Sequence, residues 1–259
     1  MPELPDVELF KTYLDATSLH KDITSVRVLE PRLLKGIGAQ KFRNAMRGNR
    51  MVGTRRHGKH LLVHLSDETW IDMHFGMTGG LKYYRTKDEP QHTAVLFTFS
   101  TGYHLACLSR RKLGSLKLTS SPEKFIQDHD LGIDAMSLNL PDFRELLARK
   151  RGAIKSLLMN QNAIAGIGNI YSDEILFQAG VLPRRSIGDL SKKDTQDIHS
   201  AMKQVLSTAV KCKADPSHMP EHFLIPHRHE GGTCPRCGGN LDTCSVSGRK
   251  AYVCPRCQT

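Results

Sequence analysis

Four cysteines near the end of the chain constrain its fold more than any other feature. They form the pairs Cys234-Pro-Arg-Cys237 and Cys254-Pro-Arg-Cys257, with sixteen residues between them. Each Cys-x-x-Cys turn presents two thiolates to one tetrahedral ion, which is the spacing of four-cysteine zinc sites. Two disulfides are the alternative, but the chain has seven cysteines, and an odd count favours reduced thiols. We therefore predict one structural Zn²⁺, in a site closed to substrate.

The segment between the two cysteine pairs predicts a hairpin with a basic tip. It contains Ser247-Gly-Arg-Lys-Ala-Tyr-Val, which turns Arg249 and Lys250 outward. Across the whole chain 37 Lys and Arg face 26 Asp and Glu, a net charge of +11 that favours a polyanionic partner such as nucleic acid. Ribosomal, membrane-surface and heparin-binding proteins share this balance, and a solvated turn is the plainer interpretation of the tip.

The spacing of apolar residues divides the rest of the chain into a β-rich part and a helical part. Residues 4–19 have helical spacing, whereas residues 23–118 carry short apolar runs between Gly, Ser, Asp and Thr breaks, as in a sandwich or flattened barrel. We place the boundary near residues 133–140. The helices expected after it cover residues 140–150, 154–159, 171–179 and 192–210.

Two further stretches bear on how the chain is used. Residues 213–231 are rich in Pro, His and Gly and are expected to form a linker. No run approaches about 18 consecutive apolar residues, so we expect no membrane span, and the first ten residues lack the pattern of a signal peptide. We therefore expect a cytoplasmic protein.

A glycine-rich turn precedes the third of these helices. Gly166 and Gly168 stand just before Asn169, which is placed to cap the helix. A helix that starts after such a turn offers free amide donors that suit a phosphate. A plain capped helix is the alternative.

Five motifs in order resemble the formamidopyrimidine-DNA glycosylase/endonuclease VIII family across nearly the whole chain. They are Met1-Pro-Glu-Leu-Pro-Asp-Val-Glu8, Arg55-Arg-His-Gly-Lys59, His74-Phe-Gly-Met-Thr-Gly79, Gly166-Ile-Gly-Asn-Ile-Tyr171 and the terminal zinc ribbon. The resemblance implies an α+β multidomain protein that acts as a monomer on damaged double-stranded DNA. Its parts are an N-terminal helix with a catalytic β-sandwich at 1–133, a helix-two-turns-helix lobe at 134–226 and a zinc-ribbon finger at 227–259.

The resemblance also implies the chemistry, that of a bifunctional glycosylase and abasic-site lyase of base excision repair. After removal of Met1, Pro2 offers a secondary amine that attacks the sugar as a nucleophile and forms a Schiff base, and Glu3 moves protons. Lys59 matches the family's active-site lysine. Arg249 matches an arginine linked to the second step of β,δ-elimination. Without the resemblance, Pro2 and Glu3 merely begin a helix, and Lys59 lies in a solvated basic loop.

The family's DNA contacts map onto further positions. Met77 matches a wedge that fills the space left by a flipped base, and Arg111 matches the arginine that pairs with the orphaned partner. Leu113 stands where an aromatic wedge is common, and core packing is the alternative for Met77 and Leu113. The remaining matches, which are expected to contact the DNA backbone or lesion strand, are Asn169, His92, Lys150 and Lys155.

Three departures from the family pattern leave the lesion preference open. Only twenty-one residues, 213–233, separate the last long helix from Cys234, where members that favour oxidised purines carry a longer stretch. Leu113 replaces an aromatic residue, and Asp6 stands where glutamate is usual. Two other functions remain as alternatives: a catalytically silent damaged-DNA-binding protein on the same scaffold, and a generic zinc-ribbon protein of transcription or translation.

Overall fold

The computed structural model describes residues 2–86 and 88–259 and divides the chain into two compact units. The first unit holds Pro2 and residues 6–130, and the second holds residues 3–5 and 131–259. Met1, whose removal the proposed nucleophile requires, lies outside the described residues. The predicted class, an α+β multidomain fold with a C-terminal zinc ribbon, is confirmed.

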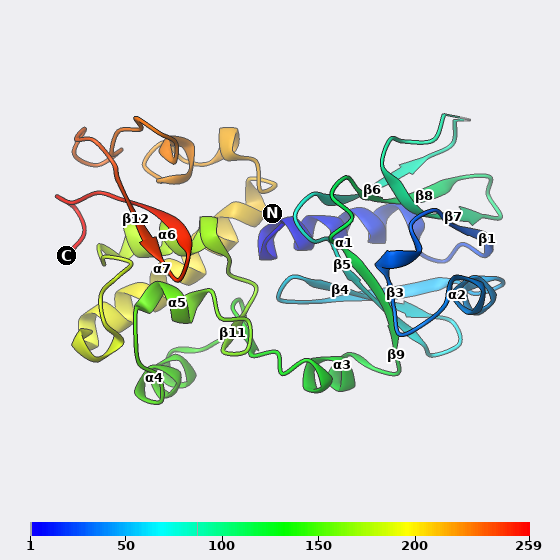
Figure 1. Cartoon of the computed structure of the whole chain (residues 1–259), viewed down its shortest axis with the longest axis horizontal. Helices are drawn as coiled ribbons and strands as arrows, with labels where there is room; N and C mark the ends of the chain where they lie inside the picture. The colour runs from blue at the N-terminus through cyan, green and yellow to red at the C-terminus, as the bar shows by residue number, and fades with distance from the viewer. Residues whose placement is uncertain (1, 87) are drawn as a thin grey trace. The chain divides into compact units, whose positions relative to one another are not determined.

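The first unit is a sandwich of two sheets (Figure 1). One sheet has the strand order β1 (Ile23–Val28), β7 (Thr93–Phe99), β8 (His104–Ser109), β6 (Gly79–Tyr84). The other has the order β2 (Leu34–Lys35), β9 (Ser115–Thr119), β5 (Trp70–His74), β4 (His60–Leu65), β3 (Met51–His57). β1, β4, β5, β7 and β8 all lie within residues 23–118, the stretch whose short apolar runs predict strands.

Alternation along the strands builds the core of this unit, because successive side chains point to opposite faces. Leu61 and Val63 of β4 and Val95 and Phe97 of β7 are fully buried in one cluster. The helix α1 (Leu4–Ser18) adds Val7 to that cluster, as the spacing of its apolar residues predicts. Two helices that the sequence did not indicate, α2 (Ala39–Met46) and α3 (Pro122–Asp128), complete the unit.

The second unit is mainly helical. The predicted helices appear as α4 (Leu140–Ala148), α5 (Ile154–Leu158), α6 (Asn169–Ala179) and α7 (Lys192–Lys211). Local chemistry sets their ends: Asn139 caps α4, and Ser191 with Asp194 forms a capping box on α7. Gly180, at φ +71°, ends α6 in the left-handed conformation that glycine tolerates. The short strands β10 (Ile133–Asp134) and β11 (Ile164–Ala165) pair in parallel.

Residues 213–231 are not a free linker, which corrects the sequence-based expectation. They form the short turns η3 (Pro216–His218) and η4 (Ile225–His227), and Phe223 and Leu224 between them are buried. Beyond them, β12 (Asp242–Val246) and β13 (Arg249–Val253) pair as the predicted hairpin. Phe177 of α6 shares a small apolar cluster with Leu224 and the finger, so the finger packs as part of the second unit. Among the described residues, no helix is long and apolar enough to cross a membrane.

Candidate active site and nucleic-acid interface

Glu3 is buried at the N-terminus of α6, although 165 residues separate it from Gly168. Its Oε2 accepts from the amides of Gly168, at 2.6 Å, and Tyr171, at 3.3 Å, and its Oε1 accepts from Ile170 at 2.9 Å. A helix N-terminus favours negative charge and leaves its first amides unpaired, so a carboxylate satisfies both requirements. Backbone amides at the start of α6 therefore fix the carboxylate of Glu3, the residue that follows Pro2 in the chain.

The glycine turn before α6 serves this arrangement. Gly166 has φ +116°, and a Cβ there would lie 2.6 Å from Cδ1 of Leu4. The Leu4 amide donates to the Gly166 carbonyl at 3.0 Å. The expectation of free amides for a phosphate is corrected, since three of these amides donate to Glu3. The N-cap of α6 is Gly168, not Asn169.

Lys59 lies in the tight turn between β3 and β4, opened by Gly58 at φ +55°. Its side chain is largely buried, with the residue 9% exposed. Arg56 ties the turn to α1: its Nε donates to Oε2 of Glu8 at 2.6 Å, and its Nη1 donates to the Gly58 carbonyl at 3.1 Å. The helix that follows Pro2 is thereby joined to the turn that carries Lys59.

Two loops of the first unit bring the three wedge candidates together. The loop after β5 carries Met77, which is 41% exposed, and the loop after β8 carries Arg111 and Leu113, which is 51% exposed. Arg111 Nη1 lies 3.2 Å from the Met77 sulfur, and the Arg111 amide donates to Oγ1 of Thr78 at 3.1 Å. Exposed apolar tips on fixed loops suit insertion between bases.

His92 lies exposed beside the end of β8. Its backbone has φ +63°, an uncommon conformation for a non-glycine residue. Its carbonyl accepts from the Ser109 amide at 2.9 Å. The imidazole is therefore carried on a constrained backbone next to the loop that holds Arg111.

His74, at the end of β5, has a strongly perturbed pKa. Partial burial, and secondarily the charge of His60, lowers the pKa of His74 to about 4. The Gly76 amide lies 3.3 Å from Nδ1, which therefore acts as an acceptor in the neutral ring. His60 pairs instead with Asp72, through Nδ1 at 2.8 Å.

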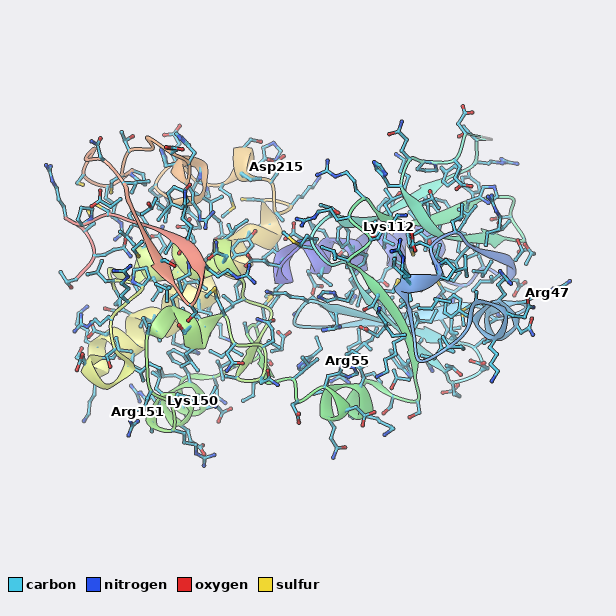
Figure 2. All side chains as sticks on the ribbon, viewed as in Figure 1. Arg47, Arg55, Lys112, Lys150, Arg151 and Asp215 are labelled. Carbon is cyan, nitrogen blue, oxygen red and sulfur yellow. The ribbon has the colours of Figure 1, made fainter. Side chains whose placement is uncertain are left out.

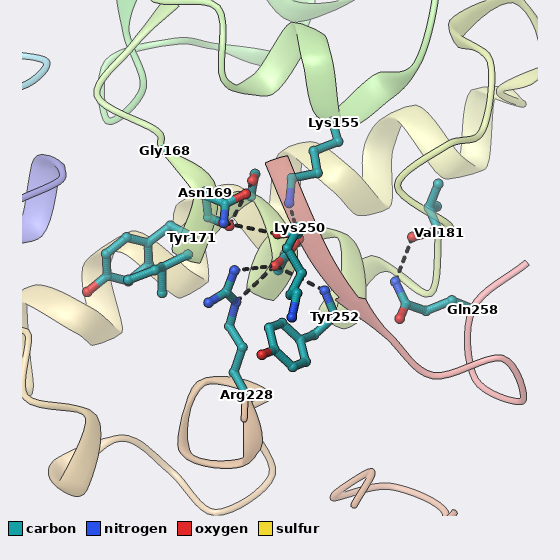
Figure 3. Close-up of polar contacts among 12 residues, drawn as sticks. Lys155, Gly168, Asn169, Tyr171, Val181, Arg228, Lys250, Tyr252 and Gln258 are labelled. Carbon is teal, nitrogen blue, oxygen red and sulfur yellow. Dashed lines mark hydrogen bonds and ion pairs between the residues drawn. The ribbon is translucent and has the colours of Figure 1, made fainter. Parts of the chain in front are cut away.

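The hairpin of the second unit presents Arg249 on a sharp turn. Ser247 and Gly248, at φ +48° and +71°, make the turn, and Arg249 follows it with an exposed side chain. Asn169 Nδ2 donates to the Lys250 carbonyl at 3.0 Å, and Oγ atoms of Ser247 and Ser156 lie 2.7 Å apart. Asn169 thus joins the start of α6 to the hairpin (Figure 3).

Lys155 was predicted to contact DNA, but the structure buries it within the second unit. Its side chain has no exposed surface, and its ammonium pairs with Asp173, which is equally buried. Arg228 adds a second pair to the same carboxylate, at 2.7 Å, and the Tyr252 amide donates to it at 3.3 Å (Figure 3). Burial lowers the pKa of Lys155, while Asp173 opposes that shift. We therefore assign Lys155 to the packing of the second unit. Lys150, in contrast, is exposed after α4 (Figure 2).

The four finger cysteines fit one zinc ion. Their sulfur atoms all lie within 4.8 Å of one another, with Cys234 to Cys257 at 3.8 Å and Cys237 to Cys254 at 3.6 Å. Four Zn–S bonds of about 2.3 Å in a tetrahedron place the sulfurs about 3.8 Å apart. The predicted structural zinc site is therefore supported by geometry as well as by spacing.

Sequence analysis did not identify several largely buried charged residues that support the candidate site residues. Asp173 and Arg228 were not singled out, and neither was Glu30, which binds the loop of Arg111. A buried acid within α6 carries no local signal, since its partners lie 18 and 55 residues away. Nothing in the sequence around Lys112 indicates its ion pair with Glu30, 82 residues earlier in the chain.

Comparison with known proteins accounts for the whole chain. Family models match the formamidopyrimidine-DNA glycosylase N-terminal domain at residues 1–116, its H2TH domain at 131–220, and a zinc finger found in FPG and IleRS at 231–259. A formamidopyrimidine-DNA glycosylase of Pelotomaculum thermopropionicum is 33% identical over 100% of this chain and 99% of the relative.

Solved structures agree. The complex of Lactococcus lactis Fpg (MutM) with FAPY-dG-containing DNA has a TM-score of 0.90 and 25% identity, covering 99% of each chain. A complex of the LlFpg protein with THF-DNA and an inhibitor has a TM-score of 0.90 and 26% identity, covering 100% of each chain.

Proposed function

Because the chain belongs to the formamidopyrimidine-DNA glycosylase family, and is a DNA glycosylase of base excision repair, we propose that Pro2 carries its chemistry. Pro2 removes an oxidised base from damaged double-stranded DNA through a Schiff base, and the enzyme then nicks the abasic strand by β,δ-elimination. The observation that carries this proposal is the buried carboxylate of Glu3, the residue that follows Pro2 in the chain, which three backbone amides hold in place.

The proposed first step is substitution at the sugar carbon that bears the base. The free Pro2 nitrogen forms a bond to C1′ as the bond to the base breaks, and ring opening leaves an iminium cation on that nitrogen. Loss of a C2′ proton then expels the 3′-phosphate, and a second elimination expels the 5′-phosphate. Glu3 is the proposed proton carrier, since it follows Pro2 directly in the chain and its carboxylate is held in place by backbone amides.

Charged groups supply the remaining roles. Lys59 is proposed to act at the lesion strand from a turn anchored to α1 through Arg56. Arg249, exposed at the hairpin turn, is proposed to bind the phosphates that leave during elimination. Asn169 already positions that hairpin through Lys250. Met77, Arg111 and Leu113 are the proposed wedge, and we place the enzyme with DNA in the cytoplasm or nucleoid.

Borohydride trapping tests the proposal. Zinc-loaded protein is incubated with a duplex containing one abasic site, reduced, and its N-terminal peptide is analysed by mass spectrometry. The expected result is a covalent adduct on Pro2 in a peptide that lacks Met1, and no adduct with Pro2→Gly. If wild-type protein binds the duplex but forms no adduct, the chain is instead a catalytically silent damage-binding scaffold.

A further inference from the structure

An ion pair outside the proposed catalytic groups holds the loop of Arg111 and Leu113. Lys112 Nζ lies 2.6 Å from Oε2 of Glu30, and Glu30 also accepts from Nε of Arg32 at 2.8 Å through its other oxygen. The Glu30 side chain is 11% exposed, whereas that of Lys112 is 54% exposed. The acid is therefore a largely buried anchor, and the lysine is the movable partner.

The backbone at Lys112 depends on such an anchor. Lys112 has φ +54°, in the left-handed region that lysine rarely adopts, and its amide donates to the Ser109 carbonyl at 3.2 Å. Strained residues persist where surrounding contacts determine them, and they cluster at functional sites. The Glu30 pair is the side-chain contact that holds this residue.

The loop of Lys112 interlocks with the loop of Met77. A Cβ on Gly76 would lie 2.5 Å from the carbonyl carbon and oxygen of Leu113, so the two backbones are in direct contact. The Arg111 amide donates to Thr78, and its guanidinium reaches the Met77 sulfur. A displacement of Lys112 is therefore transmitted to both loops.

We propose that Glu30 is a positioning residue for base displacement, which acts through Lys112 to hold Arg111 and Leu113 ready to enter the duplex. The inference rests on the proposed function, because it assigns these side chains to the wedge. A wedge already held in its inserting arrangement has less conformational freedom to lose on binding. Arg32, and then Lys112, hold the pKa of Glu30 at about 2, so the pair stays charged throughout any enzymatic pH range.

The test uses a substitution for which a general charge effect and the positioning role predict opposite changes in activity. Removing an acid from a protein that binds a polyanion strengthens binding if only the overall field matters, whereas loss of the anchor weakens base displacement. The variants are Glu30→Gln and Lys112→Asn, which removes the ammonium but keeps a residue that tolerates positive φ, together with the double variant. Glu89→Gln is the matched control, since Glu89 pairs with Arg27 in the same unit.

Two duplexes of identical sequence, one with a FAPY-dG lesion and one with an abasic site, separate displacement from later chemistry. Single-turnover excision of FAPY-dG is expected to fall about tenfold with Glu30→Gln, and the double variant is expected to be no worse than either single one. Nicking at the abasic site, where no base is displaced, is expected to change less than about twofold. Glu89→Gln is expected to match wild type.

Three outcomes overturn the inference: excision unchanged or faster with Glu30→Gln, equal losses on both duplexes, or additive losses in the double variant. If wild-type protein proves inactive, the proposed function fails, and 2-aminopurine next to the FAPY-dG lesion then tests the anchor alone. Its fluorescence change on binding is expected to be about tenfold slower with Glu30→Gln, and an equal rate contradicts the positioning role.

Discussion

At the scale of single residues, Asp173 shows how a buried charge is tolerated. Neither its carboxylate nor Lys155 has any exposed surface, and Arg228 and the Tyr252 amide complete its partners. Buried Lys155 and partly exposed Arg228 are compensated for lost solvation only while that carboxylate remains. The cluster therefore depends on Asp173 more than on any of its partners.

Substitution of Asp173 by asparagine leaves buried Lys155 and partly exposed Arg228 without their shared counter-charge. We expect Asp173→Asn to lower the free energy of unfolding by about 3–5 kcal/mol, measured by urea denaturation of zinc-loaded protein. Asp197→Asn removes the same charge from an exposed pair with Lys193 and is expected to leave stability unchanged. Equal stabilities for Asp173→Asn and wild type contradict the account of this cluster.

His74 makes stability depend on pH. Its pKa is about 4 in the folded protein and near 6.5 when exposed, so between these values the unfolded chain binds more protons. The free energy of unfolding therefore falls as pH drops through this window, by about 2 kcal/mol between pH 7 and pH 5. Urea titrations at both values test this, and His74→Gln is expected to show a smaller difference. An unchanged difference in the variant assigns the effect to other groups.

At the scale of elements, the β12–β13 hairpin depends on metal. Its apolar cluster with the rest of the second unit involves few residues, including Phe177 of α6 and Leu224 beside η4, so the four thiolates and their ion supply most of its order. The single tryptophan, Trp70, lies in β5 of the first unit and reports on that unit alone.

Zinc removal is therefore expected to separate binding from the fold of the sandwich. Chelation lowers affinity for abasic duplex at least about tenfold, because the hairpin that carries Arg249 loses its position. Trp70 emission and its urea midpoint stay the same. Tight binding after verified metal loss contradicts the role of the finger, and a shifted Trp70 midpoint contradicts the independence of the sandwich.

The elements predicted from sequence are those whose apolar pattern is long or regular. α1, α7 and the strands around β4 and β7 meet this condition. α2 offered only Phe42 and Met46 over eight residues, too short a pattern to detect, and tertiary packing decides it. Predictions of residue roles failed where partners distant in the sequence determine the role. Nothing in the sequence around Lys155 indicates that it is buried in a cluster with Asp173 and Arg228. The proposed roles of Pro2, Glu3 and Arg249 came from the motif resemblance and not from the periodicity of apolar residues.

At the scale of the whole molecule, a net charge of +11 makes DNA affinity depend on salt. Each phosphate bound by a cation releases counterions, so the logarithm of affinity falls linearly with the logarithm of salt concentration. The slope counts phosphate contacts and not total charge. Exposed and buried cations therefore contribute differently, although each adds one charge to the total.

The salt dependence of DNA affinity should therefore distinguish the exposed cations Arg249 and Lys150 from the buried cation Lys155. Arg249→Ala and Lys150→Ala are each expected to reduce the salt slope for abasic duplex by about 1, since each removes one exposed cation that we propose contacts a phosphate. Lys155→Met removes the same charge from a fully buried position, so its slope should equal that of wild type even where overall affinity falls. Fluorescence anisotropy at 50 to 200 mM salt, on variants shown to be folded, measures all three. A reduced slope for Lys155→Met returns that lysine to the DNA surface, and an unchanged slope for Arg249→Ala removes the hairpin from it.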